Sequence, residues 1–237
     1  MQSRCVYCGD LANTGDHVPP KALLVRPLPN NLLKVRSCVR CNRGASLDEQ
    51  YFLVLIGQIS TSPFIEEKLA PGGQIDRTLM RSPALEERLL QALSVDEESG
   101  RIHIQPEDER VQRVLRKTAI GLFVHRYGWS PSPEFVGPVG VYPYNIQDSR
   151  PPHYFISTFT ERFKSKRWRT VQRGVFSYIF VRDPMHSGKV WCVMDLYECL
   201  WAVVHFPNPK SKKARLEPSR WLFEETHMTG KGYAHAT

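Results

Sequence analysis

Hydrophobic positions change their spacing along this chain, and the first half shows mainly helical spacing. Ser46 followed three residues later by Glu49 is a capping-box pattern, which predicts a helix that begins at Ser46. Its apolar face comprises Tyr51, Phe52, Leu55, Ile56 and Ile59. Two further helices are predicted, one from Ser82-Pro83 to about Leu93 and a longer one from Pro106 that ends at Gly128.

Aromatic and β-branched residues dominate the later part of the chain and predict an antiparallel sheet. The candidate strands are residues 153–160, 170–182 and 189–206, the last of which can divide into two around residues 195–198. Two short extended segments, 13–18 and 32–35, precede the helices. We therefore predict an α+β protein in three regions: an N-terminal module at 1–62, a helical region at 63–130 and a β region with basic segments at 131–237.

Four cysteines near the N-terminus form two CxxC pairs, Cys5/Cys8 and Cys38/Cys41. Two such pairs supply the four soft ligands of a structural zinc ion. Cys192 and Cys199 lie in a strongly apolar stretch and are expected to pack as core thiols. No signal peptide or membrane-spanning segment is evident, so we expect an intracellular, reducing environment, where paired cysteines are more often metal ligands than disulfides.

Positive charge is concentrated at two parts of the chain. The net charge is +5 over residues 1–44, −5 over 45–149 and +9 over 150–220. Two basic regions favour a polyanionic partner, of which nucleic acid is the most common. The stretch at 163–169, with Lys164, Lys166, Arg167 and Arg169, could follow a nucleic-acid backbone, and a solvated basic loop is the simpler alternative.

The span between the CxxC pairs contains residues suited to hydrolysis. Asp16 could hold a hard divalent cation while the adjacent His17 takes a proton from water. Successive side chains of a strand point to opposite faces, so one centre for both requires a bend at Val18-Pro19-Pro20. Asn42 could add an oxygen ligand or could simply cap a helix, and Arg43 beside it could face phosphate.

The order of these residues resembles the zinc-containing form of the HNH endonuclease family. The resemblance covers residues 1 to about 50 and rests on Cys5-x2-Cys8, Asp16-His17-Val18-Pro19-Pro20, Asn31-Leu32 and Cys38-x2-Cys41-Asn42-Arg43-Gly44. It implies a treble-clef-like ββα-metal module, pinned by structural zinc, that cuts a phosphodiester backbone with one divalent cation.

The resemblance also implies a role for each matching residue. Asp16 and Asn42 would bind the cation, His17 would be the general base, and Asn31 would hold the loop and the base in place, with Asn30 as its nearest competitor. Asn42 stands where the family name has its last histidine. Oxygen ligands from Asp16 and Asn42 favour Mg²⁺ or Mn²⁺ over a catalytic Zn²⁺.

Two functions follow as expectations. The first is a metal-dependent endonuclease that acts on DNA more readily than RNA, with no membrane partner, and that could dimerise to cut both strands. The second is a zinc-knuckle protein that binds nucleic acid without cutting it.

Overall fold

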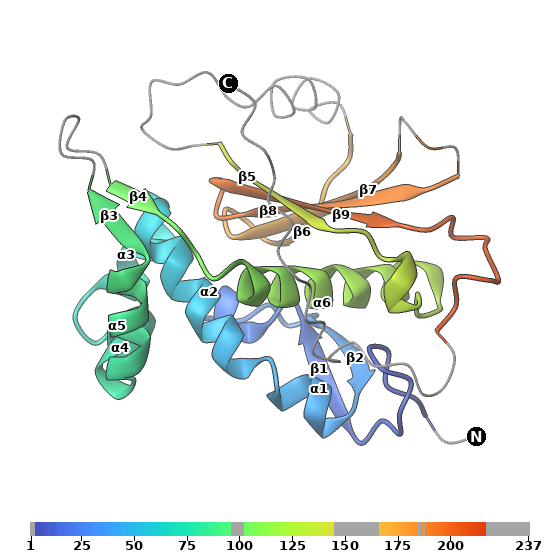
Figure 1. Ribbon diagram of the computed structural model, residues 1–237, viewed down its shortest axis with the longest axis horizontal. Helices are drawn as coiled ribbons and strands as arrows, with labels where there is room; N and C mark the ends of the chain where they lie inside the picture. Colours follow the sequence, from blue (N-terminus) through green and yellow to red (C-terminus); the bar gives the residue numbers. More distant parts are fainter. Residues whose placement is uncertain (1–2, 96–101, 145–165, 184–185, 187, 217–237) are drawn as a thin grey trace.

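The computed structural model describes residues 3–95, 102–144, 166–183, 186 and 188–216. Its architecture is α+β, with a cysteine cluster near the N-terminus, helices in the middle and an antiparallel sheet towards the C-terminus, as predicted. Figure 1 shows three layers, in which the long helix α6 (Asp108–Tyr127) lies between the sheet above and the N-terminal hairpin below. The contacts of this helix therefore determine how the other two layers pack together.

An antiparallel hairpin forms the N-terminal layer. Strand β1 (Thr14–Val18) pairs with β2 (Leu33–Ser37) in unbroken register, with Asp16 opposite Val35 and His17 opposite Lys34. The loop between them contains the short 3-10 helix η1 (Lys21–Leu23), and helix α1 (Val39–Arg43) follows β2 almost directly. Both predicted extended segments are thus strands.

Helix α2 (Ser46–Ile59) confirms the first predicted helix, but the predicted capping box is wrong. Ala45 occupies the N-cap position, and no side chain caps the helix there. The Glu49 carboxylate instead accepts a hydrogen bond from Lys117 at 2.9 Å. A tertiary ion pair has replaced the local contact that the sequence pattern suggested.

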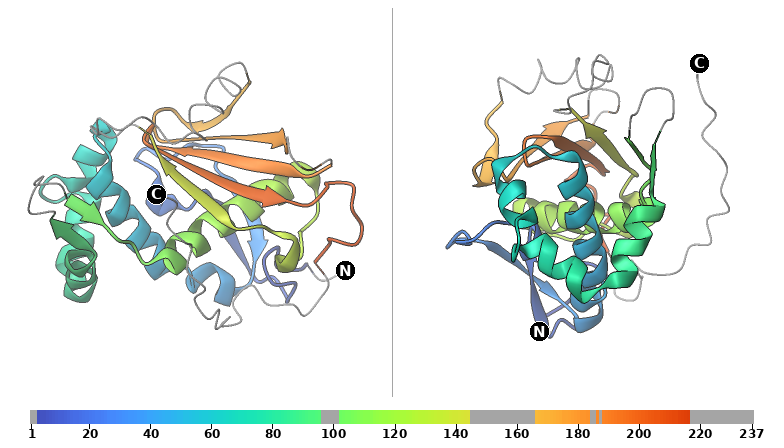
Figure 2. Two further views of the ribbon diagram at one scale, coloured as in Figure 1. Left: turned by 45° about the horizontal axis from the view of Figure 1, so that its top comes forward. Right: turned by 90° about the vertical axis from the view of Figure 1, so that its left-hand side faces the viewer.

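Three short helices lie beside α2, stacked at one end of the molecule (Figure 2). They are α3 (Pro63–Leu69), α4 (Gln74–Arg81) and α5 (Pro83–Gln91). Only α5 was predicted, because its Ser-Pro start is a clear signal, whereas α3 and α4 flank the Pro71-Gly72-Gly73 turn that suggested only a break. A two-stranded hairpin, β3 (Leu93–Val95) with β4 (Ile102–Ile104), leads into α6.

Helix α6 is the predicted long helix, and it ends at Gly128 with the left-handed φ of 76° that glycine adopts readily. Its buried side includes Val114, Leu115 and Phe123. At Gly121 the helix lies so close to β1 that an added Cβ would come within 2.6 Å of the Val18 side chain. Absence of a side chain there allows the hairpin to pack directly onto the helix.

The C-terminal layer is a five-stranded antiparallel sheet in the order β5-β9-β8-β7-β6. Its strands are β5 (Val139–Pro143), β6 (Arg169–Gln172), β7 (Phe176–Arg182), β8 (Val190–Leu196) and β9 (Leu200–Phe206). The predicted strand at 170–182 is therefore two strands, and the one at 189–206 divides at a turn where Tyr197 and Glu198 both have φ of 53°. The candidate strand at 153–160 lies outside the described residues, and β5 was hidden in a proline-rich stretch.

One hydrophobic cluster runs through all three predicted regions, from Cys5 in the N-terminal layer to Phe206 in the sheet. The predicted boundary at 62/63 lies between α2 and α3, and that at 130/131 lies just after α6. A second, smaller cluster, which contains Trp191 and Trp201, lies on the other face of the sheet. Cys192 and Cys199 are both buried within the main cluster, as expected.

Candidate metal centre and the adjoining histidine

Four cysteine sulfurs converge beside the end of β2. Every pair of the Sγ atoms of Cys5, Cys8, Cys38 and Cys41 lies within 4.8 Å, and the Cys8 and Cys38 sulfurs are 3.7 Å apart. A zinc ion with Zn–S bonds of about 2.3 Å would place its sulfurs about 3.8 Å apart in a tetrahedron. The cluster therefore has the ligands and the size for a structural zinc ion.

The two cysteine pairs reach this cluster from different backbone features. Cys5 and Cys8 lie in a tight turn that ends at Gly9, whose φ is 80°. Cys38 is the N-cap of α1, and its sulfur accepts a hydrogen bond from the Cys41 backbone N–H at 3.4 Å. A backbone hydrogen bond from Val6 to the Arg36 carbonyl, 3.0 Å long, joins the turn to β2. Zinc at this point would fasten the turn, the hairpin and α1 together.

Electrostatics in the cluster also favour a cation. The hydrogen bond with Cys41 lowers the pKa of the Cys5 thiol to about 4, so Cys5 is readily a thiolate. Burial raises the pKa of the Cys8 thiol to about 12. The pKa of the Cys41 thiol is also raised, mainly by its hydrogen bond with Cys5 and secondly by burial. Because several thiolates would repel one another in so small a space, a divalent cation is needed to hold all four ionised.

Asp16 points from β1 into the interior and meets a buried lysine. Its side chain is buried, and its Oδ2 accepts a hydrogen bond from the Tyr7 hydroxyl at 2.8 Å. The same oxygen forms an ion pair with the Lys117 ammonium at 2.9 Å. Lys117 comes from α6, 101 residues later, and is itself only 4% exposed. The candidate metal ligand is thus already engaged with a positive charge.

Lys117 joins Asp16 to a second carboxylate, that of Glu49 on α2, at 2.9 Å. Burial acts to lower the pKa of Lys117, but Glu49 and Asp16 together raise it above its ordinary value, so the ammonium stays charged. Burial raises the pKa of Glu49, and Lys117 partly opposes that shift. This cluster, Tyr7, Asp16, Glu49 and Lys117, locks the N-terminal layer onto α6.

His17 lies on the opposite, outer face of β1 and is half-buried. Lys34 is its cross-strand partner on β2, and the Lys34 side chain lies across Gly15, which has no side chain to obstruct it. Burial lowers the pKa of His17, and the charges of Lys21 and Lys34 lower it further, whereas Asp16 opposes them. The imidazole is therefore held neutral near pH 7, which is the form a general base requires.

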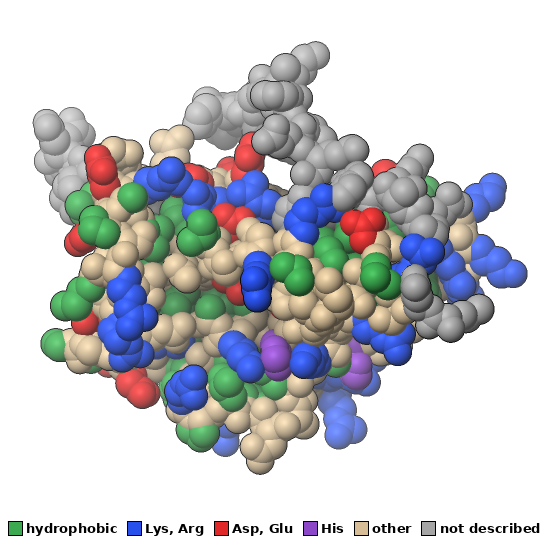
Figure 3. Space-filling view, turned by 90° about the horizontal axis from the view of Figure 1, so that it is seen from below, with side chains coloured by type: hydrophobic (Ala, Val, Ile, Leu, Met, Phe, Trp, Pro, Cys, Tyr) green, Lys and Arg blue, Asp and Glu red, His purple; other side chains and the backbone are tan. Residues whose placement is uncertain are grey.

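The remaining candidates of the N-terminal module differ in how closely they approach this face. Asn42, in α1, donates its amide N–H to the Thr14 hydroxyl and the Gly15 carbonyl, each at 3.3 Å. It is not the cap of α2. Arg43 is exposed at the end of α1, and Asn31 is exposed just before β2. Figure 3 views the molecule from below, and Lys and Arg side chains lie beside the histidine side chains on that face.

Asp16 and His17 remain on opposite faces, since the β1 register is regular through Val18 and the chain bends only afterwards. Within the part of the chain that the structure describes, both Asp16 contacts use Oδ2 and both Asn42 side-chain contacts use its amide nitrogen. The Asp16 Oδ1 and the Asn42 amide oxygen are the atoms left for a cation. Oxygen ligands of this kind suit Mg²⁺ or Mn²⁺. However, the positive charge of Lys117 already offsets one of the two negative charges of Asp16 and Glu49.

The basic C-terminal candidates are only partly described. Lys164 lies outside the described residues, while Lys166, Arg167 and Arg169 are exposed at the start of β6, an edge strand of the sheet. At the other end of β6, Gln172 exchanges hydrogen bonds of 2.9 Å with the backbone of Val25 in the β1–β2 loop. This strand therefore touches the N-terminal layer through Gln172.

Sequence reasoning missed Lys117, Tyr7 and Lys34, all of which contact the candidate residues. Lys117 had a readable signal: it occupies a position of α6 at helical spacing from the buried Val114 and Gly121. A charged residue on an apolar face is rare unless it has a partner. Nothing in the sequence says that the partner is Asp16, because that contact exists only after the helix and the hairpin have docked.

Comparisons of this chain with protein-family models, with curated proteins and with solved structures returned no match. Among the described helices, none is both long enough and apolar enough to cross a membrane.

Proposed function

We propose that this protein is a metal-dependent endonuclease that hydrolyses phosphodiester bonds of nucleic acid, with DNA as the preferred substrate. The proposal rests on one observation above all. His17 is half-buried on β1 with Lys34 opposite it, burial and the charges of Lys21 and Lys34 lower the pKa of its imidazole, and its hairpin ends beside the four-cysteine cluster. A base and flanking positive charge are what in-line attack on a phosphate requires.

In this proposal the residues divide the work. His17 accepts the proton of the attacking water, and Lys34 and Lys21 bring the scissile phosphate to it. Asp16 and Asn42 would hold Mg²⁺ or Mn²⁺, which supplies charge stabilisation on the phosphate and the leaving oxygen when bound. Because Asp16 and His17 lie on opposite faces of β1, the proposal requires β1 to bend when metal or substrate binds. Asn31 would hold the β1–β2 loop in place. Exposed Arg43, and further away Lys166, Arg167 and Arg169, would contact the nucleic-acid backbone.

The same proposal interprets β1, β2 and the following α1 as a treble-clef-like ββα-metal module. Zinc in the cysteine cluster would be structural only. The single candidate base per chain implies nicking by one protomer, or a cut in both strands by two protomers or by two successive nicks. Nothing in this arrangement requires a membrane.

The test is cleavage of supercoiled plasmid in Mg²⁺ or Mn²⁺, followed by defined duplex, single-stranded and RNA substrates. We expect His17→Ala to lower the rate by about 10²-fold or more, the contribution typical of a general base. His125→Ala is the matched control, because His125 is an exposed histidine on α6. Absence of cleavage by the intact protein on every substrate and in both metals would exclude the proposal.

A second function is favoured by the Asp16–Lys117 contact. A carboxylate already paired with an ammonium at 2.9 Å has less need of a metal. That supports a zinc-fastened protein that binds nucleic acid without cutting it. Calorimetric titration with Mg²⁺ separates the two: the endonuclease should bind the ion through Asp16 and lose it in Asp16→Asn, whereas the binding protein should retain nucleic-acid affinity with no measurable Mg²⁺ binding.

A further inference from the structure

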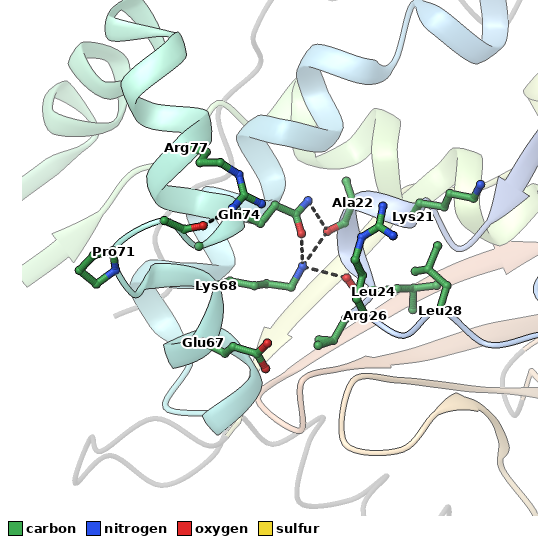
Figure 4. A pocket seen from close by; sticks show the side chains of 13 residues that line it. Lys21, Ala22, Leu24, Arg26, Leu28, Glu67, Lys68, Pro71, Gln74 and Arg77 are labelled. Carbon is green, nitrogen blue, oxygen red and sulfur yellow. Dashed lines mark hydrogen bonds between the residues drawn. The ribbon is translucent and has the colours of Figure 1, made fainter.

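A cavity of about 630 Å³ lies between the β1–β2 loop and the α3–α4 turn. Figure 4 shows its two walls, one formed by the loop around Lys21 and Arg26 and the other by α3 and α4. This volume falls in the range of about 300–1,000 Å³ that is typical of small-molecule sites. The cavity lies outside the residues that the proposed function uses, except for Lys21, which also lies near His17.

Positive charge predominates in the lining. Lys21, Arg26 and Arg77 are exposed cations of the cavity, and Glu67 is the one acidic residue among its lining residues. Half-buried Leu28 adds an apolar surface on the loop side, while Leu24 lies behind it and is almost fully buried. An occupant with an anionic group and a flat apolar part would match both features.

Lys68 adds a further positive charge beneath this surface. Its side chain is buried, and its ammonium donates to the carbonyls of Ala22 and Leu24, at 3.2 and 2.8 Å, and to the Gln74 amide oxygen. All three acceptors are neutral, and Glu67 is the acidic residue that partly offsets the ammonium charge. Burial lowers the pKa of Lys68 to about 8. An anion in the cavity would offset this cost.

The loop wall is fixed by contacts from the far end of the chain. Tyr197, in the β8–β9 turn, donates its hydroxyl to the Leu23 carbonyl at 2.9 Å. Gln172 on β6 exchanges two hydrogen bonds of 2.9 Å with Val25. With Lys68 and Gln74 on the other wall, the loop is held from two sides, so the cavity is formed before any ligand arrives. Preformed sites lose less conformational entropy when they bind.

We propose that this cavity binds one unpaired nucleotide of the nucleic-acid strand, with its phosphate between Arg26 and Arg77 and its base against Leu28. The inference rests on the proposed function, since Lys21 makes the cavity continuous with the face that carries His17. A paired nucleotide cannot place its base in a concave site, whereas an unpaired one can. The cavity therefore favours substrates with a single-stranded or unpaired segment next to the bond that is cut.

The experiment measures binding of a fluorescently labelled 12-nucleotide single strand to the full chain in a His17→Ala background, so that cleavage cannot interfere. Arg26→Ala removes an exposed cavity cation, and Arg81→Ala removes an exposed arginine at the end of α4 that does not line the cavity. We expect Arg26→Ala to weaken binding and to reduce the slope of log Kd against log salt by about 0.7, the value for one phosphate contact on a single strand. Arg81→Ala should leave that slope unchanged.

Three further measurements complete the test. Arg77→Ala should repeat the loss, with thermal melting to confirm that the turn survives removal of the Arg77 hydrogen bond to Gly72. A blunt duplex of the same sequence should respond less to Arg26→Ala than the single strand does. A nucleoside monophosphate should displace the single strand at lower concentration than inorganic phosphate, because only the former has a base.

The inference is overturned if folded Arg26→Ala and Arg77→Ala proteins both bind the single strand with the wild-type salt slope, or if the duplex is affected equally. Plasmid cleavage by a protein whose cavity variants bind normally would remove the cavity inference alone. Cavity-dependent binding by a protein that cuts nothing would remove the endonuclease proposal and leave a nucleotide-binding site.

Discussion

The Lys117 ammonium lies 2.9 Å from the Asp16 carboxylate, and so joins the middle of α6 to the strand that also carries His17. The same ammonium lies 2.9 Å from the Glu49 carboxylate, so one buried cation serves two anions. Both carboxylates therefore rely on this ammonium to balance their negative charge.

Replacement of Lys117 by Met should destabilise the protein strongly. It would leave buried Asp16 and largely buried Glu49 without their cation, a change that typically costs about 3–5 kcal/mol. The free energy of unfolding from denaturant titration measures the effect. Lys166→Met, at an exposed position, should change it by less than about 0.5 kcal/mol. A cost for Lys117→Met as small as this control would show that the cluster contributes nothing to stability.

Loss of the cysteine cluster should unfold the N-terminal layer. We expect one zinc ion per chain in the protein, and none after Cys8→Ser or treatment with a strong chelator. Because structural zinc can supply about 10 kcal/mol or more of apparent folding free energy, the melting transition should fall or disappear with the metal. Elemental analysis with thermal melting provides the measurement. Cys192→Ser removes an equally buried thiol outside the cluster and should keep the zinc.

The His17 imidazole should titrate below its ordinary pKa of 6.5. Because burial, Lys21 and Lys34 lower the folded-state pKa, the unfolded chain binds more protons at mildly acidic pH. Stability from this residue is therefore complete above about pH 6.5 and is lost as the pH falls through the folded pKa. NMR titration of the ring protons measures that pKa directly.

Lys34→Gln should raise the pKa of His17, because it removes one of the charges that oppose protonation. If cleavage depends on the neutral imidazole, the acidic limb of its pH profile should move upwards by the same amount. Lys166→Gln, remote in sequence and at an exposed position, should move neither. An unchanged NMR titration in Lys34→Gln would contradict the assigned interaction.

Gly121→Ala should disturb the docking of the hairpin on α6. The added Cβ would lie 2.6 Å from the Val18 side chain, closer than carbon atoms normally approach. Overpacking of this kind typically costs about 1–3 kcal/mol. The double variant Gly121→Ala with Val18→Ala should recover part of the loss, and a double-mutant cycle on the unfolding free energy gives that coupling. Additive effects would show that the two residues do not meet.

Long regular elements were predictable because their patterns are local. Helix α6 has its periodicity and its Gly128 stop, and the hairpin strands are bounded by the CxxC pairs and prolines. The elements missed were the short ones: α3 and α4 adjoin a Pro-Gly-Gly turn, and β5 contains glycine and proline. These form because neighbouring elements cover them, and that information is distributed across the chain.

The candidate site also has a part that local sequence predicts and a part that depends on tertiary contacts. The cysteine cluster follows from spacing alone, since each CxxC pair already sets its two sulfurs together. The contacts of Asp16 depend on the docking of α6. The same docking brings Lys117 to Glu49, which therefore does not cap its own helix. Residues that decide the electrostatics of a site therefore come from elements whose contacts no motif records.

The hydrogen bonds from Tyr197 to Leu23 and from Gln172 to Val25 span 174 and 147 residues of sequence. They have a consequence for any attempt to excise or transplant the metal-binding segment. A fragment that ended after α2 would keep all four cysteines, Asp16, His17 and Asn42, yet it would lose Lys117 and both sheet contacts to the loop. The segment is continuous in sequence, but its structure is completed by α6 and by strands that follow it much later in the chain.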